Sequence, residues 1–340
     1  MDVASLCPRV TAWMSEAPTT HPLREIIDNV TASPEPHSVG LEVLAALEDI
    51  IVTLEQADPL RLATERADFQ KAKDFNDLLI VRAELVAAAK LARTGIPFEF
   101  GSRKGTPLPD IILKNVNLAI EVKNRKLDGL RDLAAELNTA LIETKSAVTV
   151  HLGAEEWVLC IKPGERQDII EQTLQRVAAG AVENFSMELD HPWATTTKPR
   201  VRVQIFPHPP LVDDQRVFIQ DAFAATGHFT DIENEIVAVL TGDEQKTAQA
   251  KSIPTILLID IGRAGVSWIR PERIWAAQLA VRIPATTPFV GVAVMIPRIT
   301  DRNVVISLAL RDNLSEQERT DAEGLAELLR LTKDGNVWHG

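Results

Sequence analysis

The chain has 340 residues, 45% of them hydrophobic, with 36 basic and 48 acidic side chains and a net charge of −12. This length and composition can bury a sizeable core in one large domain or in two, and the acidic balance argues against a broad nucleic-acid-binding surface. Two cysteines are too few for a disulfide framework or a zinc site, so a cytoplasmic protein is expected, and no apolar run approaches the roughly 20 residues that span a membrane.

Residues 1–70 are expected to form an N-terminal extension. Residues 1–38 are rich in Pro, Ser and Thr, which predicts an irregular lead-in. Leu41 to Gln56 repeats apolar residues at helical spacing and predicts an amphipathic helix. That helix is expected to pack on the core or on a second copy of the chain, and packing on the core is favoured.

Residues 71–182 are expected to form the functional core. Phe75 to Thr94 has apolar residues at helical spacing, carries Glu84 in its middle and ends at Gly95, a residue typical of helix C-termini. Ile96 to Phe100 then predicts a first strand. A helix followed by a strand is therefore expected immediately before the most informative segment.

That segment contains two short apolar runs separated by the turn residues 115–117. Ile111 to Leu113 directly follows Asp110, and Leu118 to Ile120 directly precedes Glu121, so both runs predict buried strands. A hairpin made from them places Asp110 and Glu121 side by side. Side chains alternate along a strand, so Glu121 and Lys123 are expected on one side and Val122 in the core.

Two carboxylates with backbone carbonyls nearby form a hard-oxygen site suited to Mg²⁺ or Mn²⁺. The segment from Arg82 to Lys126, with its Pro109-Asp110 and its Glu121-Val122-Lys123, resembles the catalytic core of the PD-(D/E)XK nuclease superfamily. The resemblance implies an α/β protein with a restriction-endonuclease-like core, in which helices flank a mixed central sheet.

The resemblance also implies roles for individual residues. Asp110 and Glu121 are expected to bind the metal together with the backbone carbonyl of Val122, and Lys123 to position or activate the attacking water. Glu84 is the expected further metal contact and catalytic residue, although Glu99 is closer in sequence and could serve instead. The implied enzyme is a Mg²⁺-dependent endonuclease that hydrolyses DNA, in restriction, anti-phage defence or DNA repair, with a homodimer plausible for cutting both strands.

Simpler interpretations stay open beside this one. Pro109-Asp110 could merely begin a strand, Glu121 and Lys123 could be an exposed pair at a strand edge, and Glu84 could be a solvated helical residue. The alternative function is a nuclease-like scaffold that binds nucleic acid or a protein and does not cut.

Charge along the chain is uneven. Gly101 to Arg131 has seven basic and three acidic residues, a local charge of +4. The basic residues expected to bind the DNA backbone are Arg103, Lys104, Arg125 and Lys126. A solvated loop is the alternative, and the acidity elsewhere leaves room for a protein partner that supplies recognition. Aromatic residues are 5% of the chain and tyrosine is absent, which argues against base stacking on aromatic side chains.

After the Glu121-Val122-Lys123 triplet, the pattern predicts a helix, a strand and a helix that complete the sheet. These are Asp128–Ser146, Trp157–Lys162 and Glu165–Ala181. The polar stretch 183–199 is expected to be a boundary or a loop.

Residues 200–340 are expected to form a C-terminal α/β region that extends the same sheet or folds separately. Strands are predicted at Arg200–Phe206, Thr255–Ile261, Phe289–Ile296 and Val304–Leu310, and helices at Ile232–Leu240, Pro271–Val281 and from Ser315 to Leu331. Asp260 at the end of a strand is either a ligand-binding acid or, as favoured, a turn residue before Gly262.

Overall fold

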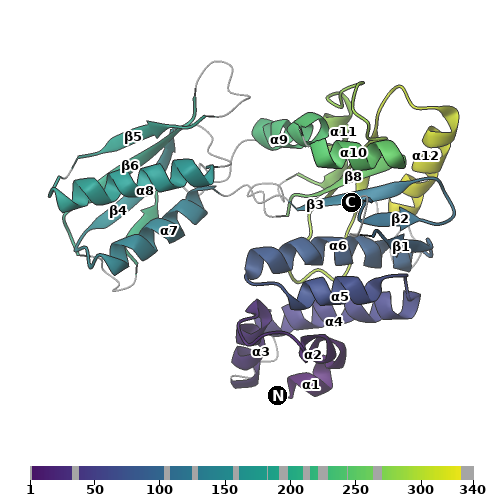
Figure 1. Cartoon of the computed structure of the whole chain (residues 1–340), viewed down its shortest axis with the longest axis horizontal. Coiled ribbons are helices and arrows are strands. Elements are labelled where there is room, and N and C mark those ends of the chain that lie inside the picture. Colours follow the sequence, from purple (N-terminus) through teal and green to yellow (C-terminus); the bar gives the residue numbers. More distant parts are fainter. Residues whose placement is uncertain are drawn as a thin grey trace. The chain divides into compact units, whose positions relative to one another are not determined.

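The computed structural model describes residues 2–32, 38–102, 108–124, 129–155, 161–181, 183–190, 198–209, 215–220, 229–242, 244–262 and 270–330 (Figure 1). In these residues the chain is an α/β protein with 12 helices and two mixed sheets. It divides into a first unit of Met1–Arg125, Ile236–Gly262 and Arg270–Gly340 and a second unit of Lys126–Glu235 and Arg263–Ile269. The predicted ranges 71–182 and 200–340 thus each contribute to both units.

The first unit contains a six-stranded sheet with the order β1-β2-β3-β8-β9-β10. Its strands are β1 (Phe98–Phe100), β2 (Ile111–Leu113), β3 (Ala119–Asn124), β8 (Thr255–Asp260), β9 (Gly291–Met295) and β10 (Ser307–Leu310). The strands β1, β2 and β3 run antiparallel, β8 and β9 continue parallel to β3, and β10 closes the edge antiparallel to β9. The strand beside β3 therefore comes from far along the sequence.

Helices cover both faces of this sheet. One face packs against α6 (Phe75–Arg93) and α12 (Glu316–Arg330), whose side chains share a core with Ile120, Ile256 and Leu258. The other face carries α10 (Glu244–Ser252) on β8 and α11 (Glu272–Ala280) on β9 and β10, as Figure 1 shows. Because both faces are covered, every residue of β8 and β9 is buried, as is usual for parallel strands.

The N-terminal segment corrects the sequence analysis, because residues 2–32 are largely helical rather than irregular. The helices are α1 (Val3–Leu6), α2 (Pro8–Met14) and α3 (Pro22–Ala32), followed by α4 (Val39–Ala57) and α5 (Leu62–Gln70). Pro8 and Pro22 stand at helix starts, where a proline costs nothing because the first amides have no helical partner. Trp13 and Leu23 are buried in the core shared with α4, so packing on the core is confirmed for that helix.

Helix α6 matches its prediction closely. Asp74 caps it by accepting from the amides of Asn76 and Asp77 at 2.8 and 2.9 Å. At the other end Gly95 has φ +75°, a left-handed conformation that favours glycine. Between these two ends, α6 carries Arg82 and Glu84 at buried positions against the sheet.

The second unit contains a four-stranded sheet with the order β5-β6-β4-β7. Its strands are β4 (Thr149–Glu155), β5 (Phe185–Glu188), β6 (Arg200–Phe206) and β7 (Val217–Ile219), and its helices are α7 (Gly129–Glu143) and α8 (Pro163–Ala178). The leucines of α7 and the isoleucines of α8 form a core of their own with β4 and β6. Helix α9 (Phe229–Gly242) follows in the chain.

This separate core explains where the predicted order is wrong. The helix after Lys123 exists as α7, but β8 rather than a strand from 157–162 lies beside β3. Residues 156–160 lie outside the described residues, and Ile161 and Lys162 lead into α8. Strand β5 also falls inside the stretch predicted to be a loop, and β4 was not predicted at all.

Most elements after residue 200 agree with the prediction. Strands β6, β8, β9 and β10 and helices α9 and α11 lie within or close to their expected ranges. The capping box before α12 forms as expected, with the Ser315 amide donating to Glu318 at 2.9 Å and the Glu318 amide donating to Ser315 Oγ at 3.2 Å. Of the helices described, none has the length and apolar character to cross a membrane.

Candidate functional site

The hairpin of β2 and β3 brings Asp110 and Glu121 to one level of the sheet, as the sequence predicted. Ile111 pairs with Phe100 on one side and with Ile120 on the other. One residue further along, the same register aligns Gly101, Asp110 and Glu121 across three neighbouring chain segments. The Gly101 amide donates to the Asp110 carbonyl at 2.8 Å, which fixes this row.

Two contacts hold Asp110 against the sheet. Its Oδ2 accepts a hydrogen bond from the backbone amide of Val122 at 2.8 Å. On the other side, a Cβ placed on Gly101 would lie 1.9 Å from the carbonyl oxygen of Pro109. Only glycine therefore lets the 109–110 segment approach the end of β1 this closely.

The Glu121-Val122-Lys123 triplet alternates across β3 as expected. Val122 is buried in the core shared with α6, and Glu121 and Lys123 alternate to the side where Leu257 and Ile259 of β8 are their neighbours. Glu121 is 0% exposed, and Lys123 is half-buried. The interpretation of an exposed pair at a strand edge is wrong for Glu121, because β8 pairs along the outer side of β3 and makes it an internal strand.

Gln249 of α10 lies beside the segment that leads into Asp110, and the sequence analysis missed it. Its Nε2 donates to the carbonyl oxygen of Leu108 at 3.0 Å. Its Oε1 is buried and has no hydrogen-bond partner among the residues that the structure describes. Gln249 belongs to a polar helical segment without a motif, so no local signal could have identified it.

The carboxyl ends of β3 and β8 are tied together by side chains. Asn124 donates from Nδ2 to Asp260 Oδ2 at 2.7 Å, and the Gly262 amide donates to Asp260 Oδ1 at 2.8 Å. The second bond confirms the interpretation of Asp260 as a turn residue before Gly262. A Cβ on Gly262 would lie 2.4 Å from the Pro297 carbonyl oxygen, so this turn also needs a glycine.

A buried arginine lies near the same end of the sheet. Arg82 of α6 is 3% exposed and donates to the carbonyl oxygens of Arg298, Ile299 and Asp301 at 2.8 to 3.2 Å. Burial lowers the pKa of this guanidinium, and the negative charges of Asp260 and Asp301 oppose that shift. Arg82 thereby anchors the 298–301 segment to α6.

Glu84 and Glu99, the two acids expected as a further metal contact, lie on different elements of the first unit. Glu84 is 7% exposed, so the solvated alternative is wrong. It lies one turn before Ala87, which with Leu91 packs toward Ile120, so α6 carries it on the Val122 side of the sheet. Glu99 on β1 forms an ion pair with Arg61 at 3.4 Å.

The four basic residues expected to contact DNA cannot be placed in the fold. Arg103, Lys104, Arg125 and Lys126 all lie outside the described residues. The amide of Lys114 donates to the Pro97 carbonyl at the turn end of the hairpin, away from Asp110. Within the described residues, Lys123 is two residues from Glu121 on the same strand, β3.

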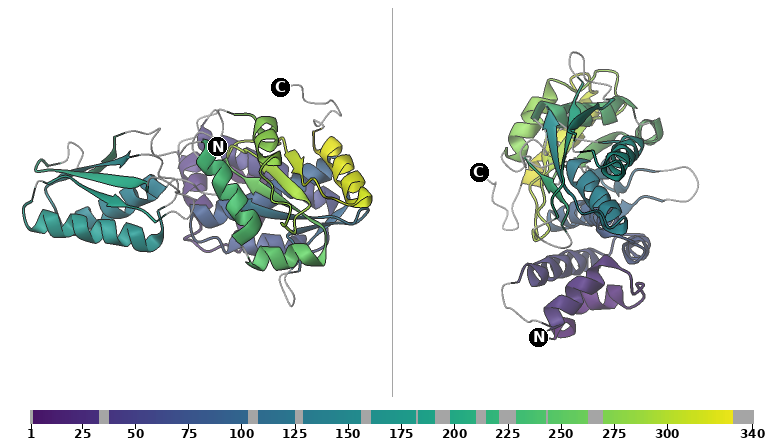
Figure 2. Two further views of the ribbon diagram at one scale, coloured as in Figure 1. Left: turned by 90° about the horizontal axis from the view of Figure 1, so that it is seen from above. Right: turned by 90° about the vertical axis from the view of Figure 1, so that its left-hand side faces the viewer.

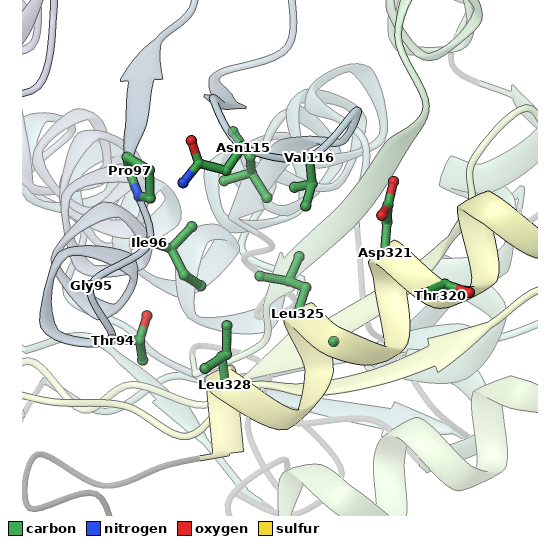
Figure 3. A pocket seen from close by; sticks show the side chains of 12 residues that line it. Thr94, Gly95, Ile96, Pro97, Asn115, Val116, Thr320, Asp321, Leu325 and Leu328 are labelled. Atoms are coloured by element: carbon green, nitrogen blue, oxygen red, sulfur yellow. The ribbon is translucent and has the colours of Figure 1, made fainter.

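A hollow of about 320 Å³ lies at that turn end of the hairpin, and Figure 3 shows the side chains that line it. Ile96, Pro97, Asn115 and Val116 line one side of it, and Leu325 and Leu328 of α12 line the other. It lies at the opposite end of β2 from Asp110, so it does not belong to the row of acids.

The oxygen atoms around Asp110 and Glu121 suit a hard cation whose other ligands are water and substrate. Asp110 and Glu121 supply carboxylates, and the Val122 carbonyl is a further oxygen beside them. Among the described residues no three or more His, Cys, Asp or Glu side chains gather as a metal-binding group. Mg²⁺ commonly takes one or two protein carboxylates and fills its remaining positions with water and phosphate oxygens, so two acids are sufficient.

Comparison with known proteins does not assign the chain to a family. No family model, no curated protein and no solved structure matches it.

Proposed function

We propose that the first unit is a Mg²⁺- or Mn²⁺-dependent nuclease that hydrolyses DNA phosphodiester bonds, built on a restriction-endonuclease-like core of α6, β1, β2, β3 and β8. The observation that carries the proposal is the row of Gly101, Asp110 and Glu121, with Lys123 two residues further along the same strand. This is the arrangement that the resemblance to the PD-(D/E)XK nucleases predicts.

Asp110 and Glu121 would hold the cation together with the Val122 carbonyl. The bound cation would lower the pKa of water and neutralise the charge that develops on the phosphate. The hydrogen bond from the Val122 amide orients the Asp110 carboxylate before substrate arrives. Gly101 lets the 109–110 segment lie close to the end of β1, so the fold sets the position of Asp110.

Lys123 supplies the positive charge of the proposed mechanism. It alternates to the same side of β3 as Glu121 and is only half-buried, so its ammonium group can reach solvent and substrate. There it would orient the attacking water and stabilise the negative charge of the in-line transition state.

The setting proposed for this enzyme is restriction, anti-phage defence or DNA repair, in the cytoplasm. A homodimer would bring two such sites to the two strands of a duplex. The net charge of −12 favours a protein partner that supplies part of the recognition, because an acidic chain repels a phosphate backbone.

The test is cleavage of supercoiled plasmid, linear duplex and single-stranded DNA by the purified chain with Mg²⁺, Mn²⁺ or EDTA. Asp110→Asn keeps the shape of the side chain and removes its charge, so cleavage should be lost while the melting temperature changes little. Asp312→Asn, at an exposed position before α12, is the matched control and should cut like the wild type. Cleavage by Asp110→Asn at the wild-type rate would exclude this site.

One observation favours the alternative, a scaffold with a nuclease-like fold that binds nucleic acid or protein without cutting. Glu121 is completely buried, and a carboxylate is costly to bury unless charges or hydrogen bonds compensate it. In such a scaffold, Glu121→Gln would change the free energy of unfolding and no nucleolytic activity would exist to lose. In the nuclease, the same substitution abolishes cleavage.

A further inference from the structure

The sheet of the second unit has one face covered by helices and one face without them. Helices α7 and α8 lie along the same side, as Figure 2 shows, and share a core with Val150, Leu152 and Val203. The intervening residues of β4 and β6 alternate to the other side. In the described part of the second unit, no helix lies on that other side.

Three rings gather on this helix-free face. The register places His151 of β4 opposite Phe218 of β7, with Phe206 of β6 opposite Thr149 in the next row. The ring centroid of His151 lies 4.8 Å from that of Phe206 and 5.7 Å from that of Phe218. All three side chains are half-buried, so part of each ring remains accessible.

The rings line a hollow of about 730 Å³ that also has polar walls. Gln220 donates from Nε2 to Gln204 Oε1 at 2.5 Å and lies 3.3 Å from His151 Nδ1. The low aromatic content of the chain argues against base stacking, but these three rings come together on one face of the sheet. His151 and Phe218 are about 70 residues apart in the sequence, and the pairing of β4 with β6 and β7 brings their rings and that of Phe206 together.

Arg202 lies at the next level of the same face. It sits opposite Gly153, and a Cβ on Gly153 would lie 3.2 Å from Arg202 Nη2, so the glycine lets the guanidinium lie close to the sheet. Its Nη2 donates to Gln220 Oε1 at 3.3 Å, and its Nε is buried and has no hydrogen-bond partner in the described part of the chain. Among the described residues Arg202 forms no ion pair, whereas Arg200 on the same face pairs with Glu188 at 2.6 Å.

We propose that this face binds single-stranded nucleic acid, with bases stacking on the rings of Phe206, His151 and Phe218 and a backbone phosphate on Arg202. Aromatic rings accept any base by its π face, and an unneutralised guanidinium matches the geometry of a phosphate. Bases in a duplex are stacked on one another, so a single strand fits the rings better. The inference goes beyond the proposed nuclease, because it needs neither Asp110 nor Glu121.

The experiment is fluorescence anisotropy of a labelled oligothymidylate with the full-length chain in EDTA, where binding is read without cleavage. Phe218→Leu keeps an apolar side chain but removes the stacking surface, and should weaken binding about tenfold. Arg202→Gln should weaken binding and flatten its salt dependence, because one phosphate contact is lost. Arg200→Gln, two residues along the same strand, is the matched control and should bind nearly like the wild type.

Circular dichroism melting of each variant would establish that the second unit is folded. Wild-type binding to single strands above a duplex of the same length, lost in Phe218→Leu and Arg202→Gln, supports the proposal. Absence of binding by the wild type, equal binding by folded variants, or preference for the duplex would overturn it. The cleavage assay with Asp110→Asn reports on the first unit separately, so failure of either proposal is seen without the other.

Discussion

Replacing Gly101 with alanine tests how the candidate site is held together. The added Cβ would lie 1.9 Å from the carbonyl oxygen of Pro109, whereas a Cβ is essentially never found within 3.0 Å of a heavy atom outside its own and the two adjoining residues. The two segments must therefore move apart by about 1 Å, and the obstacle is backbone that cannot rotate away. Because the Gly101 amide also donates to the Asp110 carbonyl at 2.8 Å, the movement displaces Asp110 from its row with Glu121.

Two effects should follow. The free energy of unfolding should fall by about 1–3 kcal/mol, the usual cost of forcing extra atoms into a packed site. Metal-dependent cleavage should fall by about a hundredfold, because a 1 Å misplacement of a reacting group can cost that much. Both effects come from one added methyl group that meets protein backbone.

Urea unfolding followed by circular dichroism measures the first effect. Gly324→Ala is the matched control, since Gly324 lies on α12 of the same unit and nothing is within 4 Å of its added Cβ. There alanine should stabilise the helix by about 1 kcal/mol, so the two variants should shift the unfolding midpoint of the first unit in opposite directions. A Gly101→Ala protein as stable and active as the wild type would refute the geometry of the row.

Three further substitutions test the first unit. Burial, with the nearby charge of Arg93, lowers the pKa of Lys90 to about 8 from 10.5. The unfolded chain therefore holds the proton more tightly, and the free energy of unfolding should rise by about 3 kcal/mol as pH rises between these values. In Lys90→Met, urea unfolding at pH 7.5 and pH 10.5 should no longer show this rise. Arg82→Met leaves three loop carbonyls without their donor, so thermal melting should show a loss of about 2–3 kcal/mol. Ser315→Ala removes the cap of α12 and should cost about 1 kcal/mol by urea unfolding. An unchanged midpoint for either of these two variants would contradict the contact assigned to it.

The sequence predicted the hairpin of the candidate site because its signals are local. Residues 115–117 form a short turn between two apolar runs, and the turn sets the register that aligns Asp110 with Glu121. The partner of β3 could not be predicted in this way. Strand β8 begins at Thr255, far along the sequence from β3. The residues between them include a second sheet with a core of its own, so they add no strand beside β3.

Composition also says less about this chain than the residue pattern does. The prolines near the N-terminus suggested an irregular segment, but Pro8 and Pro22 begin helices. A low aromatic content argues against base stacking, and this stays a prediction; what composition could not show is that alternation along β4, β6 and β7 gathers three rings on one face. Gln249 and Gly101 gained their importance from contacts across the fold, which single-sequence patterns do not contain.

The most direct test of the central claim is calorimetric titration of Mn²⁺ into the purified chain, with Asp110→Asn and Asp312→Asn alongside. If Asp110 and Glu121 hold a divalent cation, the wild type and Asp312→Asn should bind Mn²⁺ with the same affinity, and Asp110→Asn should lose that binding while remaining folded. Binding that is unchanged in Asp110→Asn, or absent from the folded wild type, would contradict the metal site and the hydrolysis that depends on it.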